Sequence, residues 1–148
     1  MKSIFDKDTR DGLIQRINTL HDGSTAQWGS MNVYQMVKHC RLCEEMMQNK
    51  QNLKQAFIGK IFGKMALKTV LKDDRPLKRS TPTIPSLVIK EVTGDLASEK
   101  ATWIANIGRY ESFSNRYFVH VFFGKMKEEQ IGQMVYKHID HHLRQFNS

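Results

Sequence analysis

Apolar side chains recur along this chain at the three- and four-residue spacing of amphipathic helices. An α-helix turns by about 100° per residue, so residues three or four apart lie on one face. The first segment shows the pattern, with Leu13, Ile14, Ile17 and Leu20 on one side. From this spacing we predict helices over residues 6–20, 31–48, 53–71, 95–110 and 127–146.

The last of these helices carries histidines on the side that should meet the core. Its apolar stripe consists of Ile131, Val135, His138, His142 and Phe146. By the same spacing, Lys137, Asp140 and Arg144 are expected to point towards water. Two imidazoles one turn apart on a buried face indicate either paired metal ligands or unusual core residues.

The helix over residues 31–48 adds a third histidine of this kind. Its outward arc is predicted to hold Lys38, Arg41, Glu44, Glu45 and Gln48. The opposite arc holds Met36, His39, Leu42, Cys43, Met46 and Met47. His39 is therefore expected to face the interior, and Cys40 and Cys43 are expected to act as small apolar packing groups.

The segment over residues 53–71 combines an apolar side with a row of lysines. The apolar side is predicted to be Phe57, Ile58, Ile61, Phe62, Met65, Ala66 and Val70, and the row is Lys60, Lys64, Lys68 and Lys72. Gly59 and Gly63, one turn apart, would let another helix approach closely. The row suits a helix on a membrane surface or on RNA, but charge runs of this kind usually face solvent. We therefore expect a solvated face of a helix that packs on the bundle or on a second subunit.

Two longer connections join the helices. Residues 72–93 contain all three prolines and are predicted to form a crossover loop, of the kind that often covers a pocket. The basic residues of this loop would attract an anionic substrate or simply be solvated; they are Arg75, Lys78 and Arg79. In the connector 111–126, residues 118–123 suit a short extended piece. His120 in this piece could point into the same cavity as the other histidines, but we expect it at the surface.

Size and composition indicate one ordinary folded domain over residues 1–148. The chain has 148 residues, of which 40% are hydrophobic and 26% charged, as in globular rather than disordered proteins. We find no secretory signal and no stretch long enough to span a membrane, so we expect a cytoplasmic protein with reduced cysteines. The net charge of +8 would attract nucleic acid, anionic lipid or an anionic substrate, and it does not choose among them.

The three inward-facing histidines suit a metal site. Imidazoles at i and i+4 of one helix, here His138 and His142, converge to ligand distance, and His39 is available on another helix as the third ligand. Three neutral nitrogens leave positions open on the ion, which is typical of catalytic sites, and imidazole suits Zn, Ni or Fe(II). Ile139 follows His138, so the glutamate of helical zinc proteases is missing.

Other interpretations of the same residues are open. Three core histidines satisfied by hydrogen bonds would need no metal, although burying several imidazoles without partners is costly. Cys40 and Cys43, directly after His39, would suit a zinc site with one histidine and two cysteines only if a fourth ligand came from elsewhere. His141, beside Gln145, would support a ligand histidine, shuttle protons, or be a plain histidine on the flank of the helix.

Two motifs resemble a known family. The motif W-G-x-M-N-x-x-Q-M over residues 28–36 precedes His39, and H-x-x-H-H-x-x-Q spans residues 138–145. Together they resemble the DinB/YfiT-like superfamily, and FFGK, KDDRP and PTIP resemble a less characterised branch usually labelled a domain of unknown function. The likeness spans nearly the whole chain. Lys127 departs from it, because a threonine or serine usually caps the last helix.

The resemblance implies an all-α, DinB-like four-helix bundle with an additional helical segment and a long crossover loop. It also implies one divalent transition metal (Zn, Ni or Fe) held by His39, His138 and His142, and often a homodimer. Characterised members include metal-dependent transferases that use low-molecular-weight thiols.

We therefore expect a metal-dependent S-transferase or hydrolase that acts on a small molecule, in which the metal activates a thiol or water. Under this hypothesis we expect no membrane span and no nucleic acid partner. The alternative is a non-enzymatic basic module that binds nucleic acid or a protein partner through the lysine row.

Overall fold

The computed structural model describes residues 1–48, 55–81, 83–114 and 118–148. Its helices are α1 (Lys7–Thr19), α2 (Val33–Gln48), α3 (Phe57–Val70), α4 (Leu96–Gly108) and α5 (Glu128–Gln145). Short 3-10 turns are η1 (Pro85–Leu87) and η2 (Arg109–Ser112), and β1 (Val119–His120) pairs antiparallel with β2 (Gly124–Lys125). The described chain is therefore mostly helical, as an all-α fold requires. The first two residues of the predicted helix 53–71, Pro82 of the crossover, and residues 115–117 of the connector lie outside the described residues.

The periodicity predicted α1, α2, α4 and α5 to within two residues at each end. Capping explains two of the starts. Asp95 Oδ1 accepts the Ser98 N–H at 2.9 Å at the start of α4. At the start of α5, Gln130 Oε1 accepts the Lys127 N–H at 2.9 Å, so the helix begins at Glu128 although the side chain of Lys127 has no acceptor atom.

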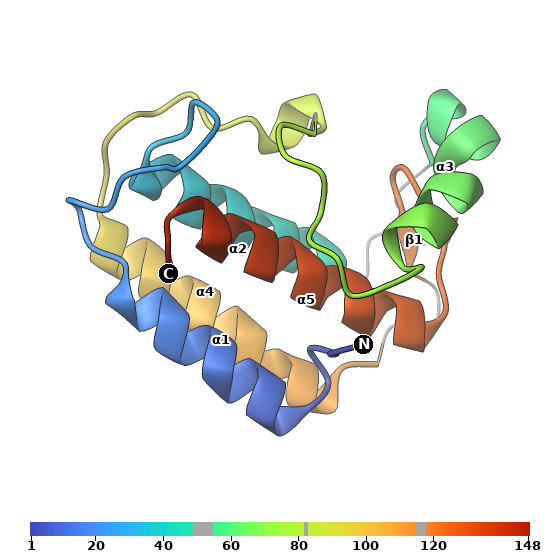
Figure 1. The fold of residues 1–148 in the computed structure, drawn as a ribbon, viewed down its shortest axis with the longest axis horizontal. Helices are drawn as coiled ribbons and strands as arrows, with labels where there is room; N and C mark the ends of the chain where they lie inside the picture. Colours follow the sequence, from blue (N-terminus) through green and yellow to red (C-terminus); the bar gives the residue numbers. More distant parts are fainter. Residues whose placement is uncertain (49–54, 82, 115–117) are drawn as a thin grey trace.

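The inward stripes of α1, α2, α4 and α5 form one hydrophobic core. Its fully buried members include Ile17, Met36, Trp103, Ile107, Ile139 and Leu143. α1 and α2 each pack along both α4 and α5 (Figure 1). Burying each large apolar side chain is worth about 1.5–3 kcal/mol relative to leaving it exposed. This core fixes the facing sides of α2 and α5, which carry the predicted ligand histidines. No helix in the described ranges is long and apolar enough to cross a membrane.

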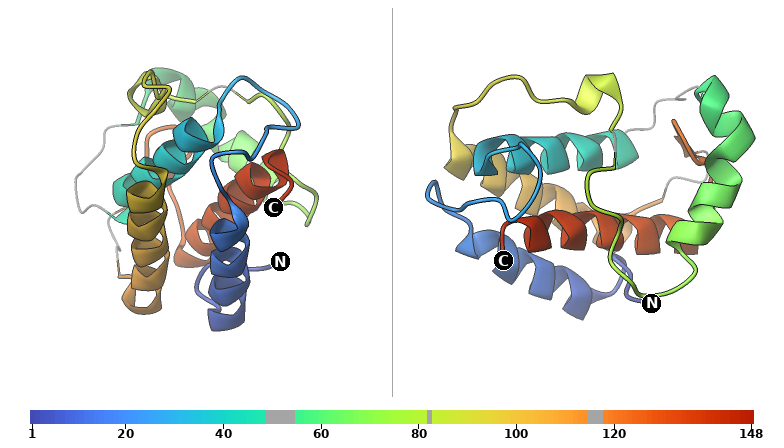
Figure 2. Two further views of the ribbon diagram at one scale, coloured as in Figure 1. Left: turned by 90° about the vertical axis from the view of Figure 1, so that its left-hand side faces the viewer. Right: turned by 45° about the horizontal axis from the view of Figure 1, so that its top comes forward.

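α3 contributes Leu67 to this core but stands at one end of the molecule, beside the β1–β2 hairpin (Figures 1 and 2). Its inner face is formed by Gly59, Gly63 and Leu67. A Cβ atom at Gly63 would lie 2.1 Å from the Phe122 carbonyl oxygen, and one at Gly59 would lie 2.4 Å from it. The two glycines therefore admit the backbone of the hairpin rather than another helix.

Most of the apolar side predicted for α3 is exposed rather than packed on the bundle, which corrects that part of the expectation, and only Ala66 and Val70 of this side are half-buried. Packing of this side on a second subunit stays a prediction. Phe57 is 77% exposed and Met65 is 64% exposed. The helix is held through its glycine face because close backbone packing requires the smallest residues. The lysines face solvent, as expected.

Two polar residues of α5 that were expected to point towards water are buried. Lys137 Nζ donates to the carbonyl oxygens of Val70 and Asp73, each at 2.7 Å. Asp140 accepts from Arg16 at 2.7 Å. Both lie on the outward side of the helix by periodicity, but the segment after α3 and the end of α1 cover them.

Glu44 of α2 is a third exception to the predicted outward arc. It is 1% exposed and accepts a hydrogen bond from the hydroxyl of Tyr110. α4 packs along this side of α2 and Tyr110 of η2 reaches Glu44, so a position that would be solvated on an isolated helix is enclosed here.

Candidate metal centre

The facing sides of α2 and α5 bring three histidines together. His39 lies on α2, and His138 and His142 lie one turn apart on α5. The ring centroids are 5.4 Å apart for His39 and His138, 5.0 Å for His39 and His142, and 4.8 Å for His138 and His142. One nitrogen of each ring lies within 4.8 Å of the chosen nitrogens of the other two. The three predicted ligands therefore lie close enough that they could hold a metal ion.

Hydrogen bonds fix the proton position on two of these rings. His39 Nδ1 lies 2.9 Å from the carbonyl oxygen of Leu87, which can only accept, so the ring donates from Nδ1. His142 Nδ1 lies 3.0 Å from Gln145 Oε1, and Gln145 Nε2 donates to the Trp28 carbonyl oxygen at 2.7 Å. Both rings, when neutral, therefore carry their proton on Nδ1 and present an unprotonated Nε2, the form that binds a metal.

His138 differs from the other two because it makes no hydrogen bond to any residue that the structure describes. Burial lowers the pKa of His138 well below its usual value, and the neighbouring rings of His142 and His39 lower it further. The ring is half-buried and its lone pair is not used by any described residue, so it is suited to a metal ligand.

The other two rings are also neutral at pH 7. Burial lowers the pKa of His142 to about 3, with a further lowering by His39. Burial also lowers the pKa of His39, and the hydrogen bond to Leu87 offsets part of this effect. Because all three rings are neutral and each keeps one nitrogen without a proton, a metal ion would displace no proton from them.

Cys43 lies directly against the cluster. Its Sγ is 3.6 Å from His39 Nε2, so the thiol donates a weak hydrogen bond to that nitrogen. Burial raises the pKa of Cys43, which keeps the group a thiol at pH 7. Cys40 faces Met36 instead, at 3.8 Å between the sulfur atoms. Both cysteines are buried and free, as expected of packing groups.

The crossover loop and the loop before α2 supply residues of the site that sequence reasoning missed. η1 lies against α2 and brings the carbonyl of Leu87 to His39. A covering role for the loop was predicted, but a backbone acceptor leaves no signal in the sequence. Gln145 does have a signal in the sequence, because it follows His142 by three residues and residues at this spacing share a helix face.

His141 lies beside the cluster rather than within it. Its ring centroid is 5.1 Å from that of His142 and 5.6 Å from that of Trp28. It lines a hollow of about 540 Å³ together with Trp28, Arg79 and Arg144. Burial lowers the pKa of His141. A neutral histidine thus stands between the hollow and a predicted ligand.

Of the three basic residues noted in the crossover loop, one reaches this hollow. The guanidinium carbon of Arg79 lies 4.2 Å from the centre of the Trp28 ring, a cation–π arrangement. Arg75 instead pairs with Asp73 at 2.6 Å. Lys78 is exposed to solvent.

His120 is half-buried on the hairpin, which corrects the expectation that it lies at the surface. Its Nδ1 accepts from the N–H groups of Phe122 and Phe123 at 3.1 and 3.2 Å, and its ring centroid is 4.6 Å from that of Phe123. Burial lowers the pKa of His120 to about 4. The hairpin turns back over the imidazole ring of His120. The alternation of His120 with apolar neighbours in the sequence does not reveal such a turn.

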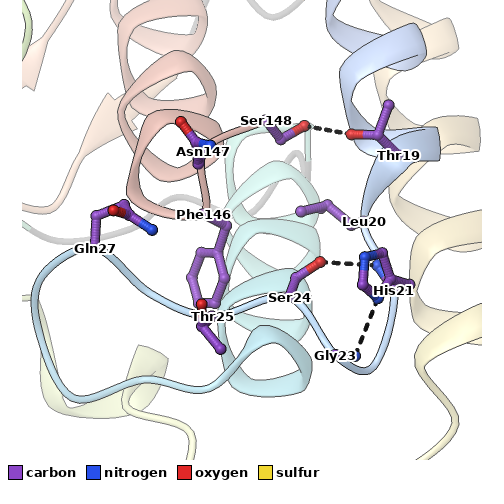
Figure 3. Close-up of a pocket in the computed structure, with 10 residues that line it drawn as sticks. All are labelled: Thr19, Leu20, His21, Gly23, Ser24, Thr25, Gln27, Phe146, Asn147 and Ser148. Atoms are coloured by element: carbon purple, nitrogen blue, oxygen red, sulfur yellow. Dashed lines mark hydrogen bonds between the residues drawn. The ribbon is translucent and has the colours of Figure 1, made fainter.

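A second hollow, of about 330 Å³, lies where the ends of α1 and α5 meet (Figure 3). His21 in its wall is bonded to its own turn. Its ring Nδ1 accepts a hydrogen bond from the backbone N–H of Gly23, and the backbone N–H of His21 donates to Ser24 Oγ, both at 3.1 Å. His21 is therefore part of this turn and takes no part in the cluster.

The chain matches a protein family. A family model described as "Protein of unknown function (DUF1569)" matches residues 5–148, which include all three clustered histidines and the helices that position them. No curated protein and no solved structure matches the chain.

Proposed function

The chain belongs to the DUF1569 family of proteins of unknown function, and we propose that it is a metal-dependent enzyme with His39, His138 and His142 as ligands. With it we propose a DinB-like four-helix bundle formed by α1, α2, α4 and α5. One observation carries the proposal: two of the imidazoles are held through Nδ1 with Nε2 unprotonated, and the third has no partner among the described residues. Core histidines with a purely structural role would normally be satisfied by hydrogen bonds.

The donor set suits a borderline divalent ion such as Zn, Ni or Fe(II). A tetrahedral zinc ion with Zn–N bonds of about 2.0–2.1 Å holds its ligand nitrogens roughly 3.4 Å apart. The nitrogens lie at most 4.8 Å apart, so the side chains would need to close in only slightly. When bound, such an ion supplies Lewis acidity that lowers the pKa of a thiol or a water molecule.

The neighbouring residues take supporting roles in this proposal. Gln145 and Leu87 hold the rings of His142 and His39 in the tautomer that binds a metal. His141, neutral and placed between the hollow and His142, is positioned to move a proton. Trp28 and Arg79 in the wall of the hollow suit a small substrate that carries a negative charge.

Two reaction classes fit this arrangement. With a low-molecular-weight thiol as cosubstrate, the thiolate would attack an electrophilic carbon of the substrate and displace its leaving group, which departs with the bonding electrons. The reaction would be an S-transfer. With water as the nucleophile it would be a hydrolysis. A screen of metal-loaded protein with thiols and electrophiles, run beside ester and amide substrates, separates the two.

The first test is the metal content of untagged protein, measured by elemental analysis. The purified chain is expected to hold close to one divalent transition metal ion, which His142→Ala should lose. His21→Ala is the matched control, because His21 is bonded to its own turn and its loss should leave the metal content unchanged.

A chain that folds but holds no metal, even after incubation with zinc, would refute the proposal. Salt-dependent binding of nucleic acid that persists in His142→Ala would favour the basic module instead.

A further inference from the structure

α3 carries an exposed apolar face. The side chains that form it are Phe57, Ile58, Ile61, Phe62 and Met65, with exposed fractions of 77%, 60%, 57%, 48% and 64%. At about 100° per residue these positions fall on one side of the helix, opposite Gly59, Gly63 and Leu67, which pack inward. A contiguous apolar surface of this kind marks a contact site more often than chance exposure.

The charge beside this face has one sign. Lys60, Lys64 and Lys68 follow one flank of it and are exposed. The sequence contains no aspartate or glutamate from residue 53 to residue 72. Whatever covers the face must therefore offer apolar groups and negative charge together.

The position of α3 leaves this face accessible. The helix stands at one end of the molecule and meets the hairpin through its glycine face (Figures 1 and 2). Lys137 of α5 bonds the carbonyl oxygen of Val70, which ties the last residue of the helix to the core. The exposed apolar face consequently points away from the rest of the protein, on a helix that is held in place at its glycine side and at its last residue.

Three occupants can be compared on these grounds. A second copy docked symmetrically through α3 would bring two lysine rows together, with no carboxylate on either helix to offset them. Nucleic acid would pair with the lysines but leave the phenylalanine and isoleucine side chains in water. An anionic lipid surface meets both needs. Its acyl chains would bury the exposed apolar face, and its phosphate groups would pair with the lysines, whose long side chains can reach the headgroups.

We propose that α3 docks the protein on the surface of membranes that contain anionic phospholipid, with its exposed apolar face inserted among the acyl chains. This inference does not depend on the metal site.

The test is flotation of the full chain with vesicles of phosphatidylcholine alone and with vesicles of equal parts phosphatidylcholine and phosphatidylglycerol. Binding is expected only to the anionic vesicles. Phe57→Ser with Ile61→Ser should weaken it by at least about tenfold. Lys60→Glu with Lys68→Glu should weaken it by at least about fivefold for each lysine. All four positions are exposed, so the variants should fold, which circular dichroism checks.

The matched control is Val92→Ser with Lys90→Glu, which makes the same kinds of change at exposed positions of the crossover loop. This variant should bind the anionic vesicles like the parent chain. Insertion itself is read with Phe57→Trp, whose fluorescence should be quenched by lipids brominated on the acyl chains.

Several results would overturn the inference: no binding to anionic vesicles at low salt, binding that the α3 variants leave unchanged, or binding without quenching by the brominated lipids. The inference would also fail if another occupant covered the exposed apolar face. A dimer dispersed by Ile61→Ser without any vesicle binding would assign the face to a second copy. Nucleic acid binding lost in the lysine variant, again without vesicle binding, would assign it to nucleic acid.

Discussion

Gln145 makes two hydrogen bonds that together determine the state of His142. Its Nε2 donates to the Trp28 carbonyl, so its Oε1 is left to accept from His142 Nδ1. Without that acceptor the imidazole could carry its proton on either nitrogen and could rotate. A side chain that touches no metal would in this way control how well one is bound.

Replacing Gln145 should therefore weaken metal binding without removing a ligand. Gln145→Met is expected to lower zinc affinity by about 10–100-fold. Gln145→Glu, which keeps an acceptor for His142 but loses the donor to the Trp28 carbonyl, should recover part of it. Competition with a chromophoric chelator measures both affinities. Equal affinities for Gln145→Met and the parent chain would show that the hydrogen bond does not matter.

Glu44 is a buried carboxyl group away from the three ligands, and it gives the stability of the chain a pH dependence. Burial raises the pKa of Glu44 to about 8, although the hydrogen bond from Tyr110 lowers it in part. A pKa raised by folding stabilises the protein fully below the unfolded value near 4.5, and this stabilisation is lost as the pH rises through about 8. The buried histidines act in the opposite direction, because their lowered pKa values cost stability as the pH falls through 6.5.

Comparison with Glu44→Gln isolates Glu44, because this variant still accepts from Tyr110 but cannot ionise, and it keeps every buried histidine. Between pH 6.5 and 8 the free energy of unfolding of metal-free parent protein should fall by about 1–2 kcal/mol relative to that of the variant.

Denaturant titrations at the two pH values provide the measurement. In the Glu44→Gln variant, stability should decline as the pH is lowered from 6.5 towards 4, where His142 and His120 stay neutral only in the folded chain. The same change in stability between pH 6.5 and 8 in the parent and in Glu44→Gln would contradict the assignment.

At the scale of elements, α3 and the hairpin form a unit held by backbone contact. The two glycines of α3 leave no room for a Cβ atom beside the Phe122 carbonyl. The rest of the molecule depends on apolar side chains shared by the other four α-helices of the described chain. Damage to the glycine contact should therefore stay local.

Gly63→Ala is expected to loosen this unit, with a cost of about 1–3 kcal/mol for overpacking. Hydrogen exchange should quicken in α3 and the hairpin and stay unchanged in α2. Gly12→Ala is the control, because a Cβ at Gly12 would meet no atom within 4 Å, and it should gain up to about 1 kcal/mol from helix propensity. Similar behaviour of the two variants would refute the close contact.

The same elements show what periodicity can predict. Helix positions and the inward direction of His39, His138 and His142 follow from local spacing, because a helix fixes the angle between its own residues. The environment of an outward position depends on what the chain places there, so Glu44 and Asp140 were assigned to water although Tyr110 and Arg16 reach them. The prediction for α3 was wrong for a related reason. Its large apolar residues were expected to face the interior, but its contact with the hairpin is made by glycines.

At the scale of the molecule, segments far apart in the sequence meet around the histidines. α2 supplies one of the three and α5 supplies two, while the loop before α2 and the crossover loop supply the carbonyls of Trp28 and Leu87. The histidines were identifiable from the sequence because their side chains and spacing are distinctive. The carbonyl partners were not, because every residue has one and only the fold selects which is used.

The most direct test of the proposed metal site is X-ray absorption spectroscopy of the chain loaded with one equivalent of zinc. Cys43 lies 3.6 Å from His39 Nε2, so a thiol is close enough to compete for the ion. Three imidazole nitrogens at about 2.0 Å, with no sulfur, are the expected result. A sulfur neighbour near 2.3 Å, or a shell of oxygen atoms alone, would contradict the site of His39, His138 and His142.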